Sequence, residues 1–330
     1  MLLTPKTPLY LPPVGTLIPV AYNDSAIQYA GRWVDTGSGK WSGWASSAIS
    51  ITVSGTLYID VTCSVVDVNT SDYCAIGYAI DNNPSELTMI TLTSAPHIFS
   101  GSLVGSIPLS DTGSHVVTIQ IMGVYASQYA TTNKITLTKL QIDANGNYSP
   151  GYTGTVKLQV VGDSWAAGYN GWTRLLDRNY FEYLCTATPG FQITHMTPQY
   201  KYDYAGNINT TDPTFAGIVI MFGVNEYNAG VSTAQFKTNM LALIDEIRLR
   251  QPTAKIIMVR TPSHGALNYG QYGTVQSEIP ALRTNTYYYS TTSLDASLAT
   301  LWLDAGHLNA TGKTIIADAL TDYLKTTIGL

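Results

Sequence analysis

Hydrophobic residues recur with two different periods along this chain of 330 residues, and the change falls near the middle. From residue 27 to about residue 142 they alternate with polar residues, most clearly at 49–53 and 57–63, on either side of a Ser-Gly turn. Such alternation predicts strands that each bury one face. No stretch in this half has a helical period. We therefore predict an antiparallel β-sandwich of the jelly-roll type.

Beyond residue 155, strand-like and helix-like segments alternate. The continuous apolar run at 217–222 is typical of a strand that is covered on both faces. A long helix is predicted at 235–250, with Ser232 or Thr233 as its N-cap, and a last helix at about 311–326. Further strands are predicted at 157–161, 181–186 and 255–259, and a short helix at 172–177. This alternation predicts an α/β fold, a parallel sheet with helices on both faces.

The domain boundaries follow from the same change of pattern. Residues 1–20 are rich in proline and predicted to be extended, and residues 21–145 form the β-sandwich. Residues 146–155 read as a linker because Asn, Gly, Ser and Pro dominate the segment around them. Residues 156–330 then form the α/β domain.

Composition and the first residues restrict the classes of binding partner and the cellular location that we expect. Charged residues make up 12% of the chain, the formal net charge is −5, and there is no Lys/Arg cluster, which argues against nucleic acid as a partner. The first residues lack a charged leader region and are interrupted by prolines, so neither a signal peptide nor a membrane span is predicted. An extracellular or virion-associated protein is favoured, which leaves the cell by another route or whose signal has been removed.

The three cysteines, Cys63, Cys74 and Cys185, do not have metal-ligand spacing. Cys63 and Cys74 either pair across adjacent strands or remain as buried free thiols. We expect no metal site.

Three polar segments of the α/β domain lie where a catalytic site would form. Ser164 follows the first strand, Asn225 follows the apolar run, and Asp304 and His307 precede the last helix. Ligands of open α/β sheets bind at the carboxyl ends of the strands. A serine becomes a nucleophile when a histidine takes its proton, and a carboxylate orients that histidine. We therefore predict a triad of Ser164, His307 and Asp304.

Acyl transfer also needs hydrogen-bond donors at the developing oxyanion. We expect them to be the backbone N–H of Ser164, the side-chain amide of Asn225 and a glycine N–H, from Gly190 or, as the reserve, Gly206. The helix predicted at 172–177 would add its positive N-terminal end near Ser164. Asp163 is expected to brace the serine loop through hydrogen bonds.

Three motifs now suggest a family: Gly-Asp-Ser at 162–164, Gly-Val-Asn at 223–225 and Asp-Ala-Gly-His-Leu-Asn-Ala-Thr-Gly at 304–312. In order and spacing they resemble the first, third and fifth blocks of the SGNH (GDSL-type) hydrolases. The resemblance covers residues 156–330. It implies a flavodoxin-like three-layer fold and a Ser-His-Asp esterase without metal or cofactor. Glu226 stands where the family commonly has an aspartate after the asparagine. The residues around Ser164 lack the second glycine of the G-x-S-x-G motif, which argues against the α/β-hydrolase fold.

A second resemblance lies in the first half of the chain. The segments 27–33, 41–43 and 49–53 are similar to the jelly-roll domain that precedes the catalytic domain in family 2 carbohydrate esterases. That resemblance implies an O-acetylated glycan as substrate. Trp165, Trp172 and Tyr227 flank the motifs and are candidates for stacking on sugar rings, and His264 is a candidate wall residue.

The sequence thus predicts a carbohydrate acetylesterase that can also oligomerise. Two alternatives stay open. One is a glycan-binding adhesin or virion tail protein with weak or no esterase activity. The other is an esterase for short-chain acyl lipids, whose activity would rise with acyl chain length.

Overall fold

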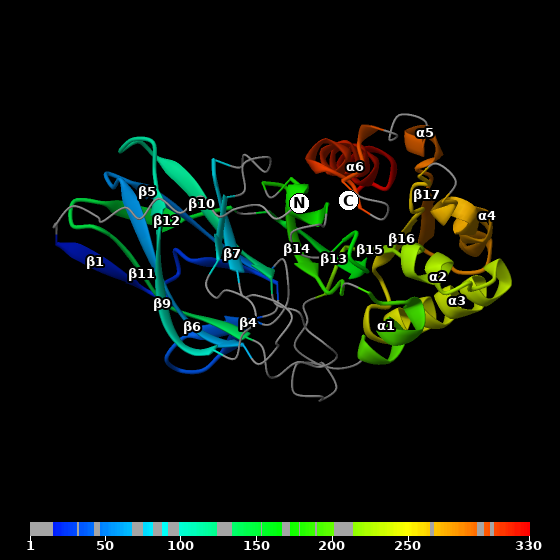
Figure 1. Cartoon of the computed structure of the whole chain (residues 1–330), viewed down its shortest axis with the longest axis horizontal. Coiled ribbons are helices and arrows are strands. Elements are labelled where there is room, and N and C mark those ends of the chain that lie inside the picture. Colours follow the sequence, from blue (N-terminus) through cyan, green and yellow to red (C-terminus); the bar gives the residue numbers. More distant parts are fainter. Residues whose placement is uncertain are drawn as a thin grey trace. The chain divides into compact units, whose positions relative to one another are not determined.

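The computed structural model divides into two compact units, residues 1–153 and residues 154–330 (Figure 1). The first is built of antiparallel strands and the second of a parallel sheet with helices. The structure describes residues 16–31, 33–42, 47–67, 75–81, 88–91, 99–123, 134–152, 154–166, 172–177, 179–188, 190–200, 214–264, 267–295, 300–303 and 307–330.

The first unit is a sandwich of two antiparallel sheets, as the alternating pattern predicted. One sheet runs in the order β3 (Val34–Asp35), β4 (Lys40–Ser42), β11 (Lys134–Asp143), β6 (Tyr58–Asp67) and β9 (Phe99–Pro108), with β1 (Leu17–Ala21) also paired to β11. The other runs β12 (Asn147–Pro150), β5 (Ala48–Ser54), β10 (His115–Gly123), β7 (Ala75–Ile80) and β8 (Thr88–Thr91), with β2 (Gln28–Ala30) also paired to β5.

One hydrophobic core joins the inner faces of the two sheets. Alternate residues of β5 and β6, such as Ile49 and Ile51 on one and Ile59 and Val61 on the other, are fully buried in it. The period of two in the sequence is therefore the inward-facing set of each strand.

The strands on either side of the Ser54-Gly55 turn are present, but they do not pair with each other. β5 pairs with β2, β10 and β12, whereas β6 pairs with β9 and β11 in the opposite sheet. Gly55, with φ of +69°, directs the chain from one sheet to the other. An alternating pattern shows which face is buried but not whether the next strand lies beside it or across the core.

Two predicted boundaries are wrong for the same reason. The extended segment predicted at 1–20 ends inside β1, which pairs with β11. Within the linker predicted at 146–155, β12 pairs with β5, and the division between the two units falls after residue 153. Turn-forming residues and proline do not exclude a segment from the edge of a sheet, where few N–H groups need partners.

Cys63 is a buried free thiol, so the disulfide with Cys74 is wrong, and the alternative of a buried free thiol is confirmed for Cys63. Burial raises the pKa of the Cys63 thiol to about 12, which makes it unreactive. Cys185 is also buried and free, and Cys74 lies outside the described residues.

The second unit has a five-stranded parallel sheet in the flavodoxin-like order, second strand, first, third, fourth, fifth. Its strands are β14 (Phe181–Cys185), β13 (Val156–Gly162), β15 (Gly217–Met221), β16 (Lys255–Val259) and β17 (Thr286–Tyr289). Four of them lie where the apolar runs predicted strands. The fifth, β17, was not predicted.

The helices of this unit are α1 (Ile193–Gln199), α2 (Val224–Asn228), α3 (Thr233–Arg250), α4 (Gly273–Glu278), α5 (Thr292–Asp295) and α6 (Ala310–Asp322), which continues as a π-helical turn at Tyr323–Thr327. Single 3₁₀ turns lie at Thr173–Leu175, Tyr269–Tyr272 and Ile279–Ala281. Ser232 caps α3 by accepting the N–H of Gln235, as predicted.

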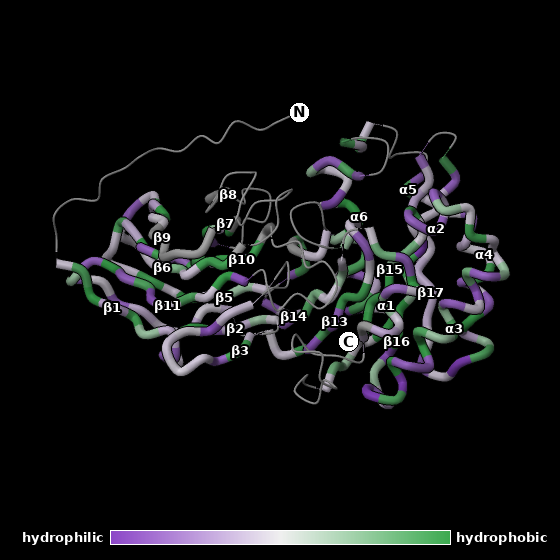
Figure 2. Tube along the Cα trace, turned by 60° about the horizontal axis from the view of Figure 1, so that its bottom comes forward, coloured by the Kyte–Doolittle hydropathy of each residue, from purple (hydrophilic) through white to green (hydrophobic). Residues whose placement is uncertain are grey.

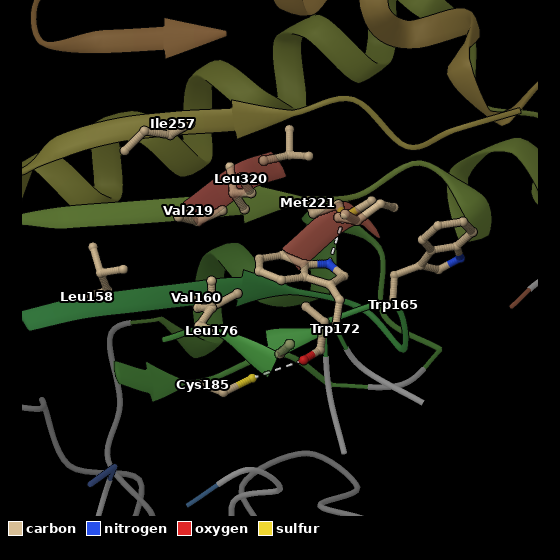
Figure 3. Packing of buried hydrophobic residues seen from close by; sticks show 14 of the residues in the cluster. Leu158, Val160, Trp165, Trp172, Leu176, Cys185, Val219, Met221, Ile257 and Leu320 are labelled. Atoms are coloured by element: carbon tan, nitrogen blue, oxygen red, sulfur yellow. Dashed lines mark hydrogen bonds between the residues drawn. The ribbon is translucent and has the colours of Figure 1, made fainter. Parts of the chain in front are cut away.

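Helices cover both faces of the sheet (Figure 1). On one face, Ile316 and Leu320 of α6 pack on Val219 of β15, and the indole N–H of Trp172 points to the Met221 sulfur at 3.1 Å (Figure 3). On the other, α1 and α3 pack on alternate residues of the same strands. The central strand β15 therefore buries hydrophobic residues on both faces, and Figure 2 colours its trace by their hydropathy.

Candidate active site

The three polar segments lie around the carboxyl ends of β13 and β15. Ser164 follows β13, and Asn225 lies in the first turn of α2, just after β15. Gly162 allows the two strand ends to approach closely, because a Cβ there would lie 2.6 Å from the Met221 carbonyl oxygen. The serine therefore emerges next to the neighbouring strand end.

Ser164 and His307, 143 residues apart in the sequence, are brought together. His307 Nε2 lies 2.9 Å from Ser164 Oγ, which is hydrogen-bond distance. The segment that carries His307 is fixed on both sides: the Leu303 N–H donates to the His307 carbonyl at 2.8 Å, and the side chain of Asn309 caps α6. Asp304 lies outside the described residues.

Asp163 braces the serine turn, as expected. Its Oδ1 accepts the Trp165 N–H at 3.0 Å, and its carbonyl accepts the Ala166 N–H at 3.1 Å. Only 1% of Asp163 is exposed. Burial raises the pKa of its carboxyl group to about 8, and the nearby charge of Glu226 also raises it, while the Trp165 N–H acts in the opposite direction. The side chain is therefore mostly neutral at pH 7.

The helix expected at 172–177 is a single 3₁₀ turn at Thr173–Leu175. The prediction rested on three apolar side chains, which is one turn of helix and too little to propagate. Ser164 itself lies in a turn that spans residues 163–166. The contribution of a helix N-terminus at residues 172–177 to the serine is therefore not supported.

Asn225 links the serine turn to the loop after β14. Its Nδ2 donates to the Phe191 carbonyl at 2.8 Å and lies 3.4 Å from Asp163 Oδ2. Gly190, directly before Phe191, is exposed and has φ of +78° in a turn closed by the Phe191 N–H and the Thr188 carbonyl. Gly206 lies outside the described residues.

Two of the aromatic residues expected to stack on sugars are in the core. Trp172 is fully buried and Trp165 is 3% exposed, so neither offers a ring face to a sugar. Both side chains belong to the hydrophobic core of the parallel-sheet unit. Tyr227 is half-buried and contacts Tyr269 edge to face, with ring centroids 5.2 Å apart.

The structure also brings in Trp302, an aromatic residue that the sequence analysis did not single out. His264 stacks on Trp302, with centroids 4.1 Å apart and an interplanar angle of 11°, and Trp302 meets Trp165 edge to face. Trp302 precedes His307 by five residues, and Trp165 follows Ser164 directly.

A partly buried ion pair fixes the segment that carries His264. Arg260, at the end of β16, donates to both carboxylate oxygens of Asp295 at 2.9 and 2.7 Å. Asp295 Oδ1 also accepts the Ser263 N–H at 2.9 Å. A bidentate pair of this kind constrains orientation as well as distance. Sequence alone offered no signal for it, because the partners are 35 residues apart.

Among the described residues, no group of three or more His, Cys, Asp or Glu side chains has an arrangement that could hold a metal ion. In the same part of the chain, every helix is too short or too polar to cross a membrane.

The comparison with known families agrees with the three sequence blocks. Residues 160–315 match the GDSL-like lipase/acylhydrolase family, and this range contains all three. The prediction of a GDSL-type ester hydrolase is thereby confirmed for this part of the chain. No curated protein matches the chain.

Solved structures extend the likeness to both units. A family two carbohydrate esterase from Clostridium thermocellum, in complex with cellohexaose, has a TM-score of 0.71 at 16% identity and covers 92% of this chain and 99% of its own. An acetyl xylan esterase from the rumen bacterium Butyrivibrio proteoclasticus has a TM-score of 0.71 at 14% identity and covers 95% of this chain and 99% of its own. A salicylyl-acyltransferase from a tetracycline biosynthetic pathway has a TM-score of 0.64 at 14% identity and covers 95% of this chain and 98% of its own. The predicted fold, a β-sandwich followed by an SGNH-type α/β unit, is confirmed.

Proposed function

We propose that this chain is a carbohydrate esterase that removes O-acetyl groups, with Ser164 as the nucleophile. The observation that carries the proposal is the 2.9 Å contact between His307 Nε2 and Ser164 Oγ. Neutral imidazole at this distance accepts the hydroxyl proton as the oxygen attacks a carbonyl carbon.

The reaction would proceed in two steps. Ser164 Oγ attacks the acetyl carbonyl while its proton moves to His307, and the sugar oxygen then leaves with that proton. A water molecule next attacks the acetyl-serine, with His307 as the base, and acetate is released. Asp304, three residues before His307, is proposed to orient the imidazole and to stabilise its charged form.

The tetrahedral intermediate of each step carries a negative oxygen. We propose the N–H groups of Ser164 and Gly190 and the amide of Asn225 as its donors. The hydrogen bond from Asn225 Nδ2 to the Phe191 carbonyl supports this role, since it fixes the amide next to the Gly190 loop. The second N–H of that amide is only weakly engaged, at 3.4 Å from Asp163, and is available to the oxyanion.

The substrate class is inferred from the fold. Two structures of similar fold are a family two carbohydrate esterase solved with cellohexaose and an acetyl xylan esterase. Because a salicylyl-acyltransferase shares the same fold, transfer of the acyl group to another alcohol is the alternative that a test has to separate.

The test compares the intact protein with Ser164→Ala on p-nitrophenyl acetate, p-nitrophenyl butyrate and acetylated xylo-oligosaccharides. We expect the wild type to release acetate from the oligosaccharides and to prefer acetyl over butyryl, and the variant to be inactive. Rising activity with chain length would favour a lipid esterase, and acyl transfer to an added alcohol without acetate release would favour a transferase. Glycan binding without any turnover would favour the adhesin.

Asp304→Asn tests the third residue. We expect kcat to fall by on the order of 10³–10⁴ with the fold intact, because the imidazole loses the partner that orients it. Near-normal turnover would mean that another group orients His307.

A further inference from the structure

The loop that carries Gly190 is not held in place by the packing of Gly190. This residue is exposed, and no atom lies within 4 Å of the position that a Cβ would occupy. Within the loop itself, the described backbone hydrogen bonds include one turn contact of 3.2 Å, from the Phe191 N–H to the Thr188 carbonyl. The Thr188 N–H, just before Gly190, donates to the Gly162 carbonyl at 3.0 Å, so the direction of the Gly190 N–H is set by this bond together with contacts further along the loop.

Those contacts come from α2. The next three residues of the loop are each tied to Asn225 or Glu226. Asn225 Nδ2 donates to the Phe191 carbonyl at 2.8 Å, and Gln192 Nε2 donates to the Asn225 carbonyl at 3.2 Å. The Ile193 N–H donates to Glu226 Oε1 at 2.7 Å, the shortest of the three.

The contact of Glu226 is costly to maintain. The residue is 1% exposed, and Oε2 has no hydrogen-bond partner in the part of the chain that the structure describes. Burial raises the pKa of this carboxyl group to about 7. Its backbone hydrogen bonds lower the pKa, and the bond from the Ile193 N–H has the largest effect of these. A buried polar group with one unsatisfied oxygen destabilises a fold. An apolar residue at 226 would avoid that cost, but it could not accept the Ile193 N–H.

We propose that Glu226 is a positioning residue of the Ser164 site: by accepting the Ile193 N–H it holds the loop so that the Gly190 N–H points to the oxyanion. This inference rests on the proposed function. An aspartate, the residue more usual here, is shorter by one methylene and would leave the Ile193 N–H out of reach at the present backbone positions. The length of Glu226 therefore matches the position of this loop.

The test compares two neutral substitutions of similar size. Glu226→Gln keeps an oxygen that accepts the Ile193 N–H, whereas Glu226→Met removes it. We expect Glu226→Met to lower kcat about tenfold or more, since misplacing one oxyanion donor costs part of the roughly 10²–10³ that its removal costs. KM should change less than threefold, and Glu226→Gln should recover most of the lost kcat. Equal kcat in the two variants, high or low, would overturn the proposal.

Gln251→Met is the matched control. Gln251 is buried, and its Oε1 accepts the Phe215 N–H at 3.1 Å near the amino end of β15, away from the serine. The Gln251→Met variant should lose stability, as Glu226→Met does, but its kcat should stay at the wild-type value. If Glu226→Met does not fold, Glu226→Asp replaces it. The carboxyl group stays and the reach is lost, so kcat should fall, and wild-type kcat would overturn the proposal.

Failure of this inference differs from failure of the proposed function. If the wild type has no esterase activity, the proposed function fails. If the wild type is active and Ser164→Ala is not, while the Glu226 variants all match the wild type, only the positioning role fails.

Discussion

An Asp163→Asn substitution is expected to change how the stability of the parallel-sheet unit depends on pH. Asp163 is buried beside Ser164, and burial raises the pKa of its carboxyl group from 3.8 to about 8. Asparagine has nearly the same shape and keeps an oxygen for the Trp165 N–H, which Asp163 Oδ1 accepts at 3.0 Å. The substitution therefore removes a titrating proton with little change in packing.

The sign follows from proton linkage. Because the folded-state pKa is above the unfolded one, the folded state holds a proton between about pH 4 and 8 that the unfolded state has released. This contribution to stability is complete below pH 4 and is lost as pH rises towards 8. One pKa unit corresponds to about 1.4 kcal/mol, so from pH 5 to pH 7 the wild type should lose roughly 2–3 kcal/mol through Asp163 alone. The asparagine variant should not show this loss of stability.

Urea unfolding followed by circular dichroism at 222 nm measures this unit, since every helix in the described residues lies in it. Free energies of unfolding of wild type and variant are compared at pH 5, 6 and 7. The burial of Glu226, which raises its pKa to about 7, adds a slope of the same sign in both proteins, so the difference between them reports on Asp163 and on its electrostatic coupling to Glu226.

The control is Asp245→Asn. The hydrogen bond from Arg283 lowers the pKa of Asp245, so its contribution is lost only as pH falls below the normal range of a carboxyl group. The difference in free energy of unfolding between Asp245→Asn and the wild type should be constant from pH 5 to pH 7. If the Asp163→Asn difference is constant as well, Asp163 is ionised over this range and the argument from burial is refuted.

Two further outcomes are expected. Leu320→Ala in α6 removes a fully buried side chain from the face next to Val219 and should cost about 2–5 kcal/mol in the same urea titration, whereas a cost below 1 kcal/mol would contradict the described packing. In the sandwich, a hydrogen bond to Asp81 at 2.7 Å raises the pKa of His115, so its contribution is present below about pH 6.5 and lost as pH rises through the folded pKa. In calorimetry, His115→Gln should lower Tm more at pH 5.5 than at pH 9, and an equal loss at both would count against the ion pair.

Local patterns determined much of the fold. The apolar run at 217–222 is β15, and the helical period at 235–250 ends where α3 ends. The alternation at 49–53 is the buried face of β5. Each of these signals depends on residues within one turn or a few strand positions of each other, so the sequence contains all of the information. The three blocks of the hydrolase family are likewise short and contiguous.

The pairing of Ser164 with His307 was predicted from motif order, but the distance between them exists only in the folded chain. The same is true of the sheet to which β5 and β6 belong, of the edge strand β12, and of the burial of Trp165. Glu226 was visible in the sequence as a departure from a motif, yet its contact with Ile193 depends on where α1 begins in space. Strand pairing, burial and pKa shifts arise from residues far apart in the chain, and a local pattern carries no information about which of them meet.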